Sequence, residues 1–204
     1  MIMIAEDAAE AVGQVQDGST VLLGGFGNPG QPMELIDALL DSGARDLTVV
    51  NNNAGQADAG LALLIKERRV AKMICSFPRQ SDSWHFDEAY RAGEIQLELV
   101  PQGNLAERLR AAGAGIGGFF TPTGYGTVLA EGKETRVIEG RGYVLEQPLP
   151  GDIALIKRCA PTRPETWSTG RRPGTSGRSW PRRPPALSSR WMSSCRWAAS
   201  IPSM

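Results

Sequence analysis

Short apolar runs alternate along the chain with segments whose apolar residues recur at helical spacing. The runs predict strands at 20–23, 47–50, 71–75, 95–100 and 153–156, and the helical spacing predicts helices at 5–15, 32–43, 61–65 and 105–112. Two further runs, 135–138 and 143–145, flank Glu139-Gly140-Arg141-Gly142 and predict a β-hairpin near 135–146. Strands that alternate with helices indicate an α/β fold, with a mostly parallel sheet and helices on both faces.

Four of the predicted strands are followed by loops of unusual composition. These loops are 24–30, 51–55, 76–83 and 101–104. The carboxyl ends of parallel strands meet at one edge of a sheet, and ligands of such folds bind beyond that edge. Packing alone does not explain four such loops at one edge, so the pattern predicts a functional site there.

The loop 24–30 joins a buried strand to a helix and is rich in glycine. Glycines allow a backbone to approach a ligand closely, and free N–H groups at the start of a helix can bind an anion. No Gly-Lys-Ser/Thr sequence ends the loop, which excludes a P-loop. Gly25, Gly27 and Gly30 have the dinucleotide-binding spacing, but asparagines occupy 51–53, where that motif needs an acidic residue. An ordinary strand-to-helix turn with packing glycines is the alternative.

The composition argues against several kinds of site. A single histidine, His85, argues against a zinc centre and against Ser-His or Cys-His nucleophiles, so we interpret it as a packing or surface residue. The three cysteines do not make an even disulfide set, and Cys75, at the end of a predicted strand, is interpreted as core. No apolar run reaches the length of about 18 residues that a membrane span needs, and no signal peptide is recognisable. We therefore expect a cytoplasmic protein with no metal and no membrane partner.

The segment that begins Asp17-Gly18, continues through Gly24-Gly25-Phe26 and closes with Gly30-Gln31-Pro32 resembles the signature of the class I 3-oxoacid CoA-transferases, in their A-type subunit. The resemblance extends over nearly all of residues 15–157 and includes the segments 52–55, 101–108, 114–127 and 131–134. Residues 75–83 are similar to the subset of the family that acts on 3-oxoadipate with succinyl-CoA. The resemblance implies a CoA-transferase-like (NagB/RpiA-like) domain at 1–157, incomplete at its C-terminal end.

The resemblance also implies a mechanism and a partner. In this family CoA is transferred by a ping-pong reaction, through a glutamate that lies in a Glu-Asn-Gly-type motif of the B subunit. No glutamate of this chain is followed by Asn-Gly. We therefore expect a chain that is inactive alone and works with a B subunit, on a CoA thioester as substrate and a 3-oxo acid as acceptor. No permanently bound cofactor and no nucleic acid are expected.

Candidate site residues follow from the matching positions. Gln102 matches the family's oxyanion donor, and a side-chain amide supplies an N–H without a competing charge. A turn glutamine bonded to backbone is the alternative. The loop would serve the CoA or acyl group through its residues Gly24, Gly25, Phe26, Gly27, Asn28, Pro29 and Gly30.

Five further residues are candidates for binding the acyl substrate. Asn51, Asn52 and Asn53 could line the acyl pocket or could simply cap the following segment. In the Phe77-Pro78-Arg79 loop, Phe77 is a candidate contact and Arg79 could bind the second carboxylate of 3-oxoadipate bidentately. A solvated loop arginine is the alternative for Arg79.

The resemblance stops after Lys157. Residues 158–204 contain nine Arg, one acidic residue and seven of the 14 prolines, and they show neither strand nor helix periodicity. Read one base earlier, their codons can spell family-like peptides: Trp191-Met192-Ser193 can encode Val-Asp-Glu, and the residues from Trp197 can encode Leu-Gly-Gly-Ile-Asp-Pro-Glu-His. We therefore expect a frameshift near Lys157, a tail at 158–204 without regular packed structure, and poor assembly with the B subunit.

Three other functions stay open. One is the same reaction on a short-chain acid such as acetoacetate, against which the Phe77-Pro78-Arg79 loop argues. Another is a catalytically dead, truncated subunit that at most binds CoA or its partner. The third is a nucleic-acid binder that works through the arginine-rich tail, which the excess of acids in residues 1–157 weakens, at 21 Asp/Glu against 13 Lys/Arg.

Overall fold

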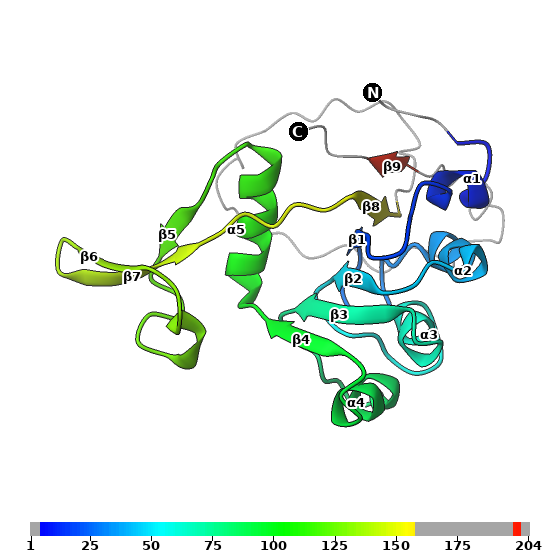
Figure 1. Cartoon of the computed structure of the whole chain (residues 1–204), viewed down its shortest axis with the longest axis horizontal. Helices are drawn as coiled ribbons and strands as arrows, with labels where there is room; N and C mark the ends of the chain where they lie inside the picture. The colour runs from blue at the N-terminus through cyan, green and yellow to red at the C-terminus, as the bar shows by residue number, and fades with distance from the viewer. Residues whose placement is uncertain (1–4, 158–197, 201–204) are drawn as a thin grey trace, which may run out of the picture. The chain divides into compact units, whose positions relative to one another are not determined.

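A computed structural model describes residues 5–157 and 198–200 of the chain. Its main sheet has the strand order β4-β3-β2-β1-β8-β9, parallel except for the last strand (Figure 1). The strands are β1 (Thr20–Leu23), β2 (Leu47–Val50), β3 (Val70–Cys75), β4 (Gln96–Leu99), β8 (Ile153–Ile156) and β9 (Ala198–Ser200). Strands β2, β3 and β4 follow one another on one side of β1, and the chain then returns to place β8 on the other side of β1. This reversal next to β1 is the place where open α/β sheets bind ligands.

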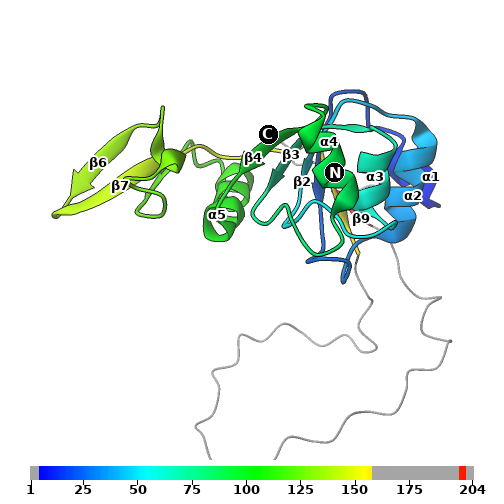
Figure 2. The same cartoon turned by 90° about the horizontal axis from the view of Figure 1, so that it is seen from below.

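Helices cover both faces of the main sheet (Figures 1 and 2). One face carries α1 (Ala8–Val12), α2 (Met33–Ser42), α3 (Leu61–Lys66) and α4 (Trp84–Arg91), and the other carries α5 (Gln102–Gly113). The larger core packs Leu35 and Phe86 from these helices against Val49 of β2. The smaller core packs Leu105 of α5 against Val50, the next residue of the same strand. Strand β2 is thus apolar on both sides, as a central parallel strand must be.

A second, antiparallel sheet has the order β5-β7-β6. Its strands are β5 (Phe119–Thr121), β6 (Thr135–Ile138) and β7 (Arg141–Glu146), and the short 3-10 helix η1 (Val128–Ala130) lies between β5 and β6 in the chain. The turn residues Glu139 and Gly140 have φ angles of 50° and 76°. Two positive φ angles are typical of the tight turn that matches strand twist, so the predicted hairpin is confirmed.

The predicted α/β class, the parallel sheet and its five strands are confirmed, whereas the bounds of two helices differ. Helix α1 is shorter than predicted at both ends. The Asp7 carboxylate accepts a hydrogen bond from the Glu10 N–H (2.8 Å) and caps the helix just before Ala8. The helix ends at Val12, where the N–H of the C-cap residue Gly13 donates to the Glu10 carbonyl (3.2 Å). Helix α5 begins at Gln102, three residues earlier than predicted, and the Leu105 N–H donates to the Pro101 carbonyl (2.8 Å). Residues 102–104 are therefore the first turn of a helix and no loop.

Four elements of the described residues escaped prediction: α4, β5, η1 and β9. Helix α4 buries only Phe86 and Ala89, which is too few apolar positions to show a helical period. Strand β5 is three residues long and follows a glycine-rich stretch, and it is a strand because it pairs with β7. Among residues 5–157, no helix is long and apolar enough to cross a membrane.

Most of the predicted frameshift tail, residues 158–197 and 201–204, lies outside the described residues. Within the described part, β9 pairs antiparallel with β8, with Ala199 opposite Leu155. The expectation of no regular structure at 158–204 does not hold for these three residues. Strand β8 pairs with β1 on one side, and the backbone groups on its other side pair with β9.

Candidate functional site

Buried Gln31 holds the glycine-rich loop 24–30 in place. Its Nε2 donates to the Gly27 carbonyl (2.7 Å), and its Oε1 accepts from the Leu61 N–H at the start of α3 (3.2 Å). Gly25 has a φ of 117°, and a Cβ at this residue would lie 2.7 Å from Cγ of Gln31, so both conformation and space require glycine. Sequence reasoning gave Gln31 no role. Its only signal was its place between the loop and Pro32, at the start of the helix.

The same loop leaves several backbone donors without a partner. The Gly24 N–H donates to the Leu155 carbonyl on β8 (2.9 Å), which ties the loop to the neighbouring strand. Within the described part of the chain, no hydrogen bond engages the N–H groups of Gly27, Asn28 or Gly30. Asn28 and Gly30 are exposed, whereas Gly27 is buried. Unpaired N–H groups on exposed residues of a fixed loop are suited to bind anionic or carbonyl oxygens.

Asn51 and Asn53 face inward and fasten the loop that follows β2. Nδ2 of Asn51 donates to the Leu23 carbonyl at the end of β1 (2.7 Å), and its Oδ1 accepts from the Asn53 N–H (3.0 Å). Oδ1 of Asn53 in turn accepts from the Gly55 N–H (2.8 Å). Both side chains are buried, so their hydrogen bonds hold the backbone of this loop rigid.

Asn52 meets Gln102, the first residue of α5. Side chains alternate along an extended segment, which puts residue 52 on the side opposite to its two buried neighbours. Nδ2 of Asn52 donates to Oε1 of Gln102 (2.7 Å), and the Asn52 carbonyl accepts from the N–H groups of Ser76 and Phe77 (3.1 and 3.0 Å). The structure therefore joins predicted site residues from the ends of β2, β3 and β4. The side chain of Gln102 is bonded to another side chain rather than to backbone.

The edge around this pair also presents two aromatic rings and an arginine. Phe26 is 69% exposed and Phe77 is 60% exposed, which is unusual for side chains of this size. Arg79 Nε donates to Oδ1 of Asp87 in the first turn of α4 (2.7 Å). Its two terminal amino groups make no hydrogen bond with a described residue, so Arg79 is held in place and can still bind a carboxylate.

His85 is paired with an acidic side chain, and Cys75 lies in the core. His85 Nε2 lies 2.7 Å from Oδ1 of Asp58, and this hydrogen bond, with a second one from Lys66, holds the pKa of Asp58 below its usual value. Cys75 is fully buried, and burial raises the pKa of its thiol to about 12. A thiol of that pKa stays protonated at neutral pH and is no nucleophile. The prediction that Cys75 belongs to the core is confirmed.

A buried carboxylate outside the predicted site, Glu146, joins α5 to the second sheet. Oε1 of Glu146 lies 2.7 Å from Nζ of Lys133 and accepts from Nδ2 of Asn104 on α5 (3.3 Å). Arg108, also on α5, adds a longer contact of 4.0 Å to Oε2. Sequence reasoning did not identify this cluster, because residues 42 positions apart meet only in the folded chain.

Glu98 on β4 carries a second ion-pair network. Its carboxylate lies 2.6 Å from Nζ of Lys72 and 2.7 Å from Nη1 of Arg108. Burial opposes ionisation of Glu98, but the hydrogen bonds from Lys72 and Arg108 together outweigh it, so the pKa of Glu98 is lowered. Arg108 thus contacts both networks and fixes α5 against the sheet.

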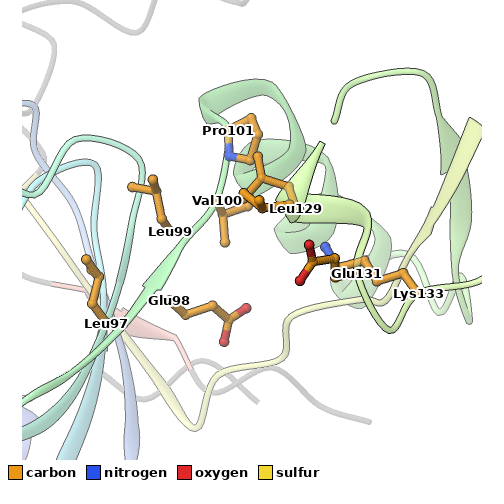
Figure 3. A pocket seen from close by; sticks show the side chains of 9 residues that line it. Leu97, Glu98, Leu99, Val100, Pro101, Leu129, Glu131 and Lys133 are labelled. Carbon is orange, nitrogen blue, oxygen red and sulfur yellow. The ribbon is translucent and has the colours of Figure 1, made fainter. Parts of the chain in front are cut away.

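A cavity of about 350 Å³ lies beside this network, between β4 and the segment that contains η1 (Figure 3). It is lined by Leu97, Glu98, Leu99, Val100, Pro101, Val128, Leu129, Glu131 and Lys133. Its lining contains none of the predicted site residues, although Pro101 directly precedes Gln102. No group of three or more potential metal ligands occurs among the residues that the structure describes. The amide pair and the loops around it therefore remain the better candidate for chemistry.

Comparison with protein families gives a match to the model described as "Coenzyme A transferase" over residues 5–164. The chain is 65% identical over 152 residues to the A subunit of the 3-oxoadipate CoA-transferase of Pseudomonas putida, a match that covers 74% of this chain and 66% of that protein. It is 52% identical over 153 residues to the A subunit of the succinyl-CoA:3-ketoacid coenzyme A transferase of Xanthomonas campestris pv. campestris, a match that covers 75% and 62%. The chain thus spans about two thirds of the length of these curated relatives.

Among solved structures, an acyl-CoA transferase from E. coli O157:H7, in a thioester complex with CoA, has a similar fold. The TM-score is 0.64 at 25% sequence identity, and the match covers 74% of this chain and 33% of that one.

Proposed function

Because this chain belongs to the coenzyme A transferase family, we propose that it is the A subunit of a two-subunit enzyme that moves CoA from succinyl-CoA to 3-oxoadipate. The observation that carries the proposal is the Asn52–Gln102 pair, which holds a side-chain amide at the ligand-binding edge of the sheet. The identity of 65% to a 3-oxoadipate enzyme, against 52% to a 3-ketoacid enzyme, supports the choice of acid.

The proposed reaction begins on the partner subunit. There a glutamate carboxylate attacks the thioester carbonyl of succinyl-CoA, the C–S bond breaks, and CoA leaves as thiolate from a succinyl-glutamate anhydride. The thiolate then attacks the glutamyl carbonyl and releases succinate, which leaves a glutamyl-CoA thioester. The same steps then run in reverse order with the second acid. The carboxylate of 3-oxoadipate attacks the glutamyl-CoA thioester and displaces CoA thiolate, which gives an anhydride of 3-oxoadipate and the glutamate. The thiolate attacks the 3-oxoadipyl carbonyl of this anhydride, which forms 3-oxoadipyl-CoA and restores the glutamate carboxylate.

This chain contributes groups that stabilise charge. Each step passes through a tetrahedral centre with an oxyanion, and fixed donors at that oxygen lower the barrier. We assign one donor to Nε2 of Gln102 and further contacts to CoA or the acyl group to the loop 24–30, where Gly27, Asn28 and Gly30 have unpaired N–H groups. No catalytic glutamate is required of this chain, so the site is complete only with the B subunit.

Arg79 is the residue that we assign to substrate choice. Its terminal amino groups can pair with the second carboxylate of 3-oxoadipate, which acetoacetate lacks. Asp87 orients the guanidinium through Nε, and this fixed orientation favours a planar, bidentate contact. The alternative acceptor, a short-chain 3-oxo acid, would leave the two terminal amino groups of Arg79 without a carboxylate partner.

The test is an assay of the chain with a CoA-transferase B subunit. We would measure exchange of CoA between succinyl-CoA and either 3-oxoadipate or acetoacetate, using this chain and, in parallel, a form whose frame is restored after Lys157. We expect turnover by the restored pair, none by either protein on its own, and a kcat/KM at least about tenfold higher for 3-oxoadipate. A stable pair without CoA exchange would reject the function, and a preference for acetoacetate would reject the substrate.

The frameshift remains part of the proposal. The family match ends at residue 164 and the relatives match over 152 to 153 residues, so most of 158–204 lies outside the shared region. We propose that a shift near Lys157 replaced the family's last segment and that the chain as written assembles poorly with the B subunit. Sequencing the coding DNA across the Lys157 codon tests the shift: bases that cannot spell the family-like peptides one position earlier contradict it.

A further inference from the structure

We propose that Asn52 is a positioning residue, which sets the orientation of the Gln102 amide so that Nε2, and not Oε1, faces the reacting carbonyl. The inference rests on the proposed function and deepens it. It gives Asn52 a role different from lining the acyl pocket, because Asn52 would act on the substrate only through Gln102.

The orientation of Gln102 matters because its amide has two ends of opposite character. The NH2 end stabilises an oxyanion, whereas the carbonyl end repels it. A half-turn about the last side-chain bond exchanges the two ends, and this torsion has no strong preference of its own. Gln102 is exposed at the start of α5, so its surroundings must select the productive orientation.

Asn52 supplies that selection. Its Nδ2 donates to Oε1 of Gln102 (2.7 Å), and a half-turn of Gln102 alone would bring two NH2 groups together. Among the described residues, no other hydrogen bond engages the Gln102 side chain. The amide nitrogen of Gln102 is therefore left free to donate to a ligand.

The backbone around Asn52 is fixed before any substrate binds. Its carbonyl accepts from two N–H groups of the loop after β3, and its neighbours Asn51 and Asn53 are anchored through buried side-chain hydrogen bonds. A short side chain on a rigid backbone places its amide at a fixed point beside Gln102. The three consecutive asparagines thus have different roles. Asn51 and Asn53 fix the backbone of the loop, and Asn52 binds the side chain of Gln102.

The Asn52→Asp variant reverses the selection. An aspartate has the shape of asparagine but can only accept, so it would bind Nε2 of Gln102 and turn Oε1 toward the substrate. In the frame-restored chain paired with its B subunit, we expect kcat to fall by about 10²–10³, the cost of one oxyanion donor, with an unchanged KM. Asn52→Ala, which leaves Gln102 unguided, should lower kcat by about 10- to 100-fold.

Two further variants separate positioning from other effects. Gln96→Glu makes the same amide-to-acid change at an exposed residue at the start of β4, at the opposite edge of the sheet, and should leave kcat unchanged. Gln102→Ala combined with Asn52→Ala should lose no more activity than Gln102→Ala alone, because Asn52 has nothing left to orient. Additive losses, or a raised KM with unchanged kcat, would show that Asn52 contacts substrate itself and would overturn the inference. An active Asn52→Asp enzyme would overturn it too.

A measurement on the uncomplexed chain keeps the inference separate from the proposed function. The Gln102 side-chain NH2 signal can be assigned in an NMR spectrum by its absence from Gln102→Ala. We expect it to move downfield in Asn52→Asp, where it gains a carboxylate acceptor, and to stay in place in Gln96→Glu. A signal already at the Asn52→Asp position in the unmutated chain would mean the inverted orientation and would overturn the inference. Absent turnover of the unmutated pair, by contrast, would reject only the proposed function.

Discussion

Lys133 Nζ lies 2.7 Å from Oε1 of Glu146, a carboxylate whose side chain is only 4% exposed. Lys133 lies in the segment before β6, and Glu146 is the last residue of β7. The ion pair therefore connects the start of the hairpin β6–β7 to its end. Through Asn104 the same carboxylate also contacts α5. The pair therefore links the hairpin to the helix whose first residue is Gln102.

We predict that Lys133→Met destabilises the chain by about 1–3 kcal/mol, because it leaves the buried Glu146 carboxylate without its closest cation. The figure lies below the cost of about 3–5 kcal/mol for breaking a buried pair, since Lys133 is partly exposed and Arg108 remains 4.0 Å away. Urea unfolding measures the loss. The double variant Lys133→Met with Glu146→Gln should recover part of it, and a double variant that is no more stable than the single one would contradict this explanation.

Gly25→Ala should destabilise the chain more than Gly18→Ala. Both glycines have a positive φ, 117° and 80°, so alanine is strained at either position by about 1–2 kcal/mol. At Gly18 nothing lies within 4 Å of the added Cβ, whereas at Gly25 Cγ of Gln31 lies 2.7 Å away, and the extra clash should add about 1–3 kcal/mol. Thermal unfolding of the two variants measures the difference. Equal losses would mean that the contact with Gln31 contributes nothing.

Stability should depend on pH through Glu98. Its folded-state pKa is lowered, since hydrogen bonds from Lys72 and Arg108 outweigh burial, so its contribution is full above the unfolded pKa and is lost as the pH falls through the folded pKa. At pH 7 we expect Glu98→Gln to be less stable than the unmutated chain by about 1 kcal/mol. The difference should shrink below about pH 4.3, the ordinary pKa of glutamate. Urea unfolding of both chains across pH 3–7 measures it, and a constant difference would contradict the assignment.

Cys75 should resist thiol reagents in the folded chain. Its pKa of about 12 leaves almost no thiolate at pH 8, and the side chain is buried. In a Cys159→Ser, Cys195→Ser background, we expect no fast labelling by Ellman's reagent in buffer and labelling of one thiol in urea. Rapid labelling in buffer would place Cys75 at the surface and refute the core assignment.

Sequence patterns predicted much of this fold and part of its candidate site. Apolar runs such as 47–50 and 153–156 predict central strands, because strands buried on both faces must be apolar throughout. The start of α5 was placed three residues too late, since Gln102, Gly103 and Asn104 carry no apolar period and only the Pro101 carbonyl shows where the helix begins. Helix α4 was missed for the same reason, as it buries only two side chains.

The sequence by itself determined which residues could take part in the proposed chemistry. The glycines of the loop 24–30, the three asparagines after β2 and Gln102 are properties of local sequence, and so is the family membership that they indicate. Local sequence also predicts that these segments share one edge of the sheet, because parallel strands all end on the same side.

Only the tertiary structure decided how these residues act on one another. Asn52 meets Gln102 across 50 positions of chain, and Gln31 bridges the glycine loop to α3 across 30. Along the segment after β2, side chains alternate, so Asn51 and Asn53 point inward and Asn52 points outward. The residue types cannot show this difference, because all three residues are asparagines. Hydrogen bonds are directional and reach about 3 Å, so their partners are set by the packing of whole strands and helices rather than by neighbouring residues.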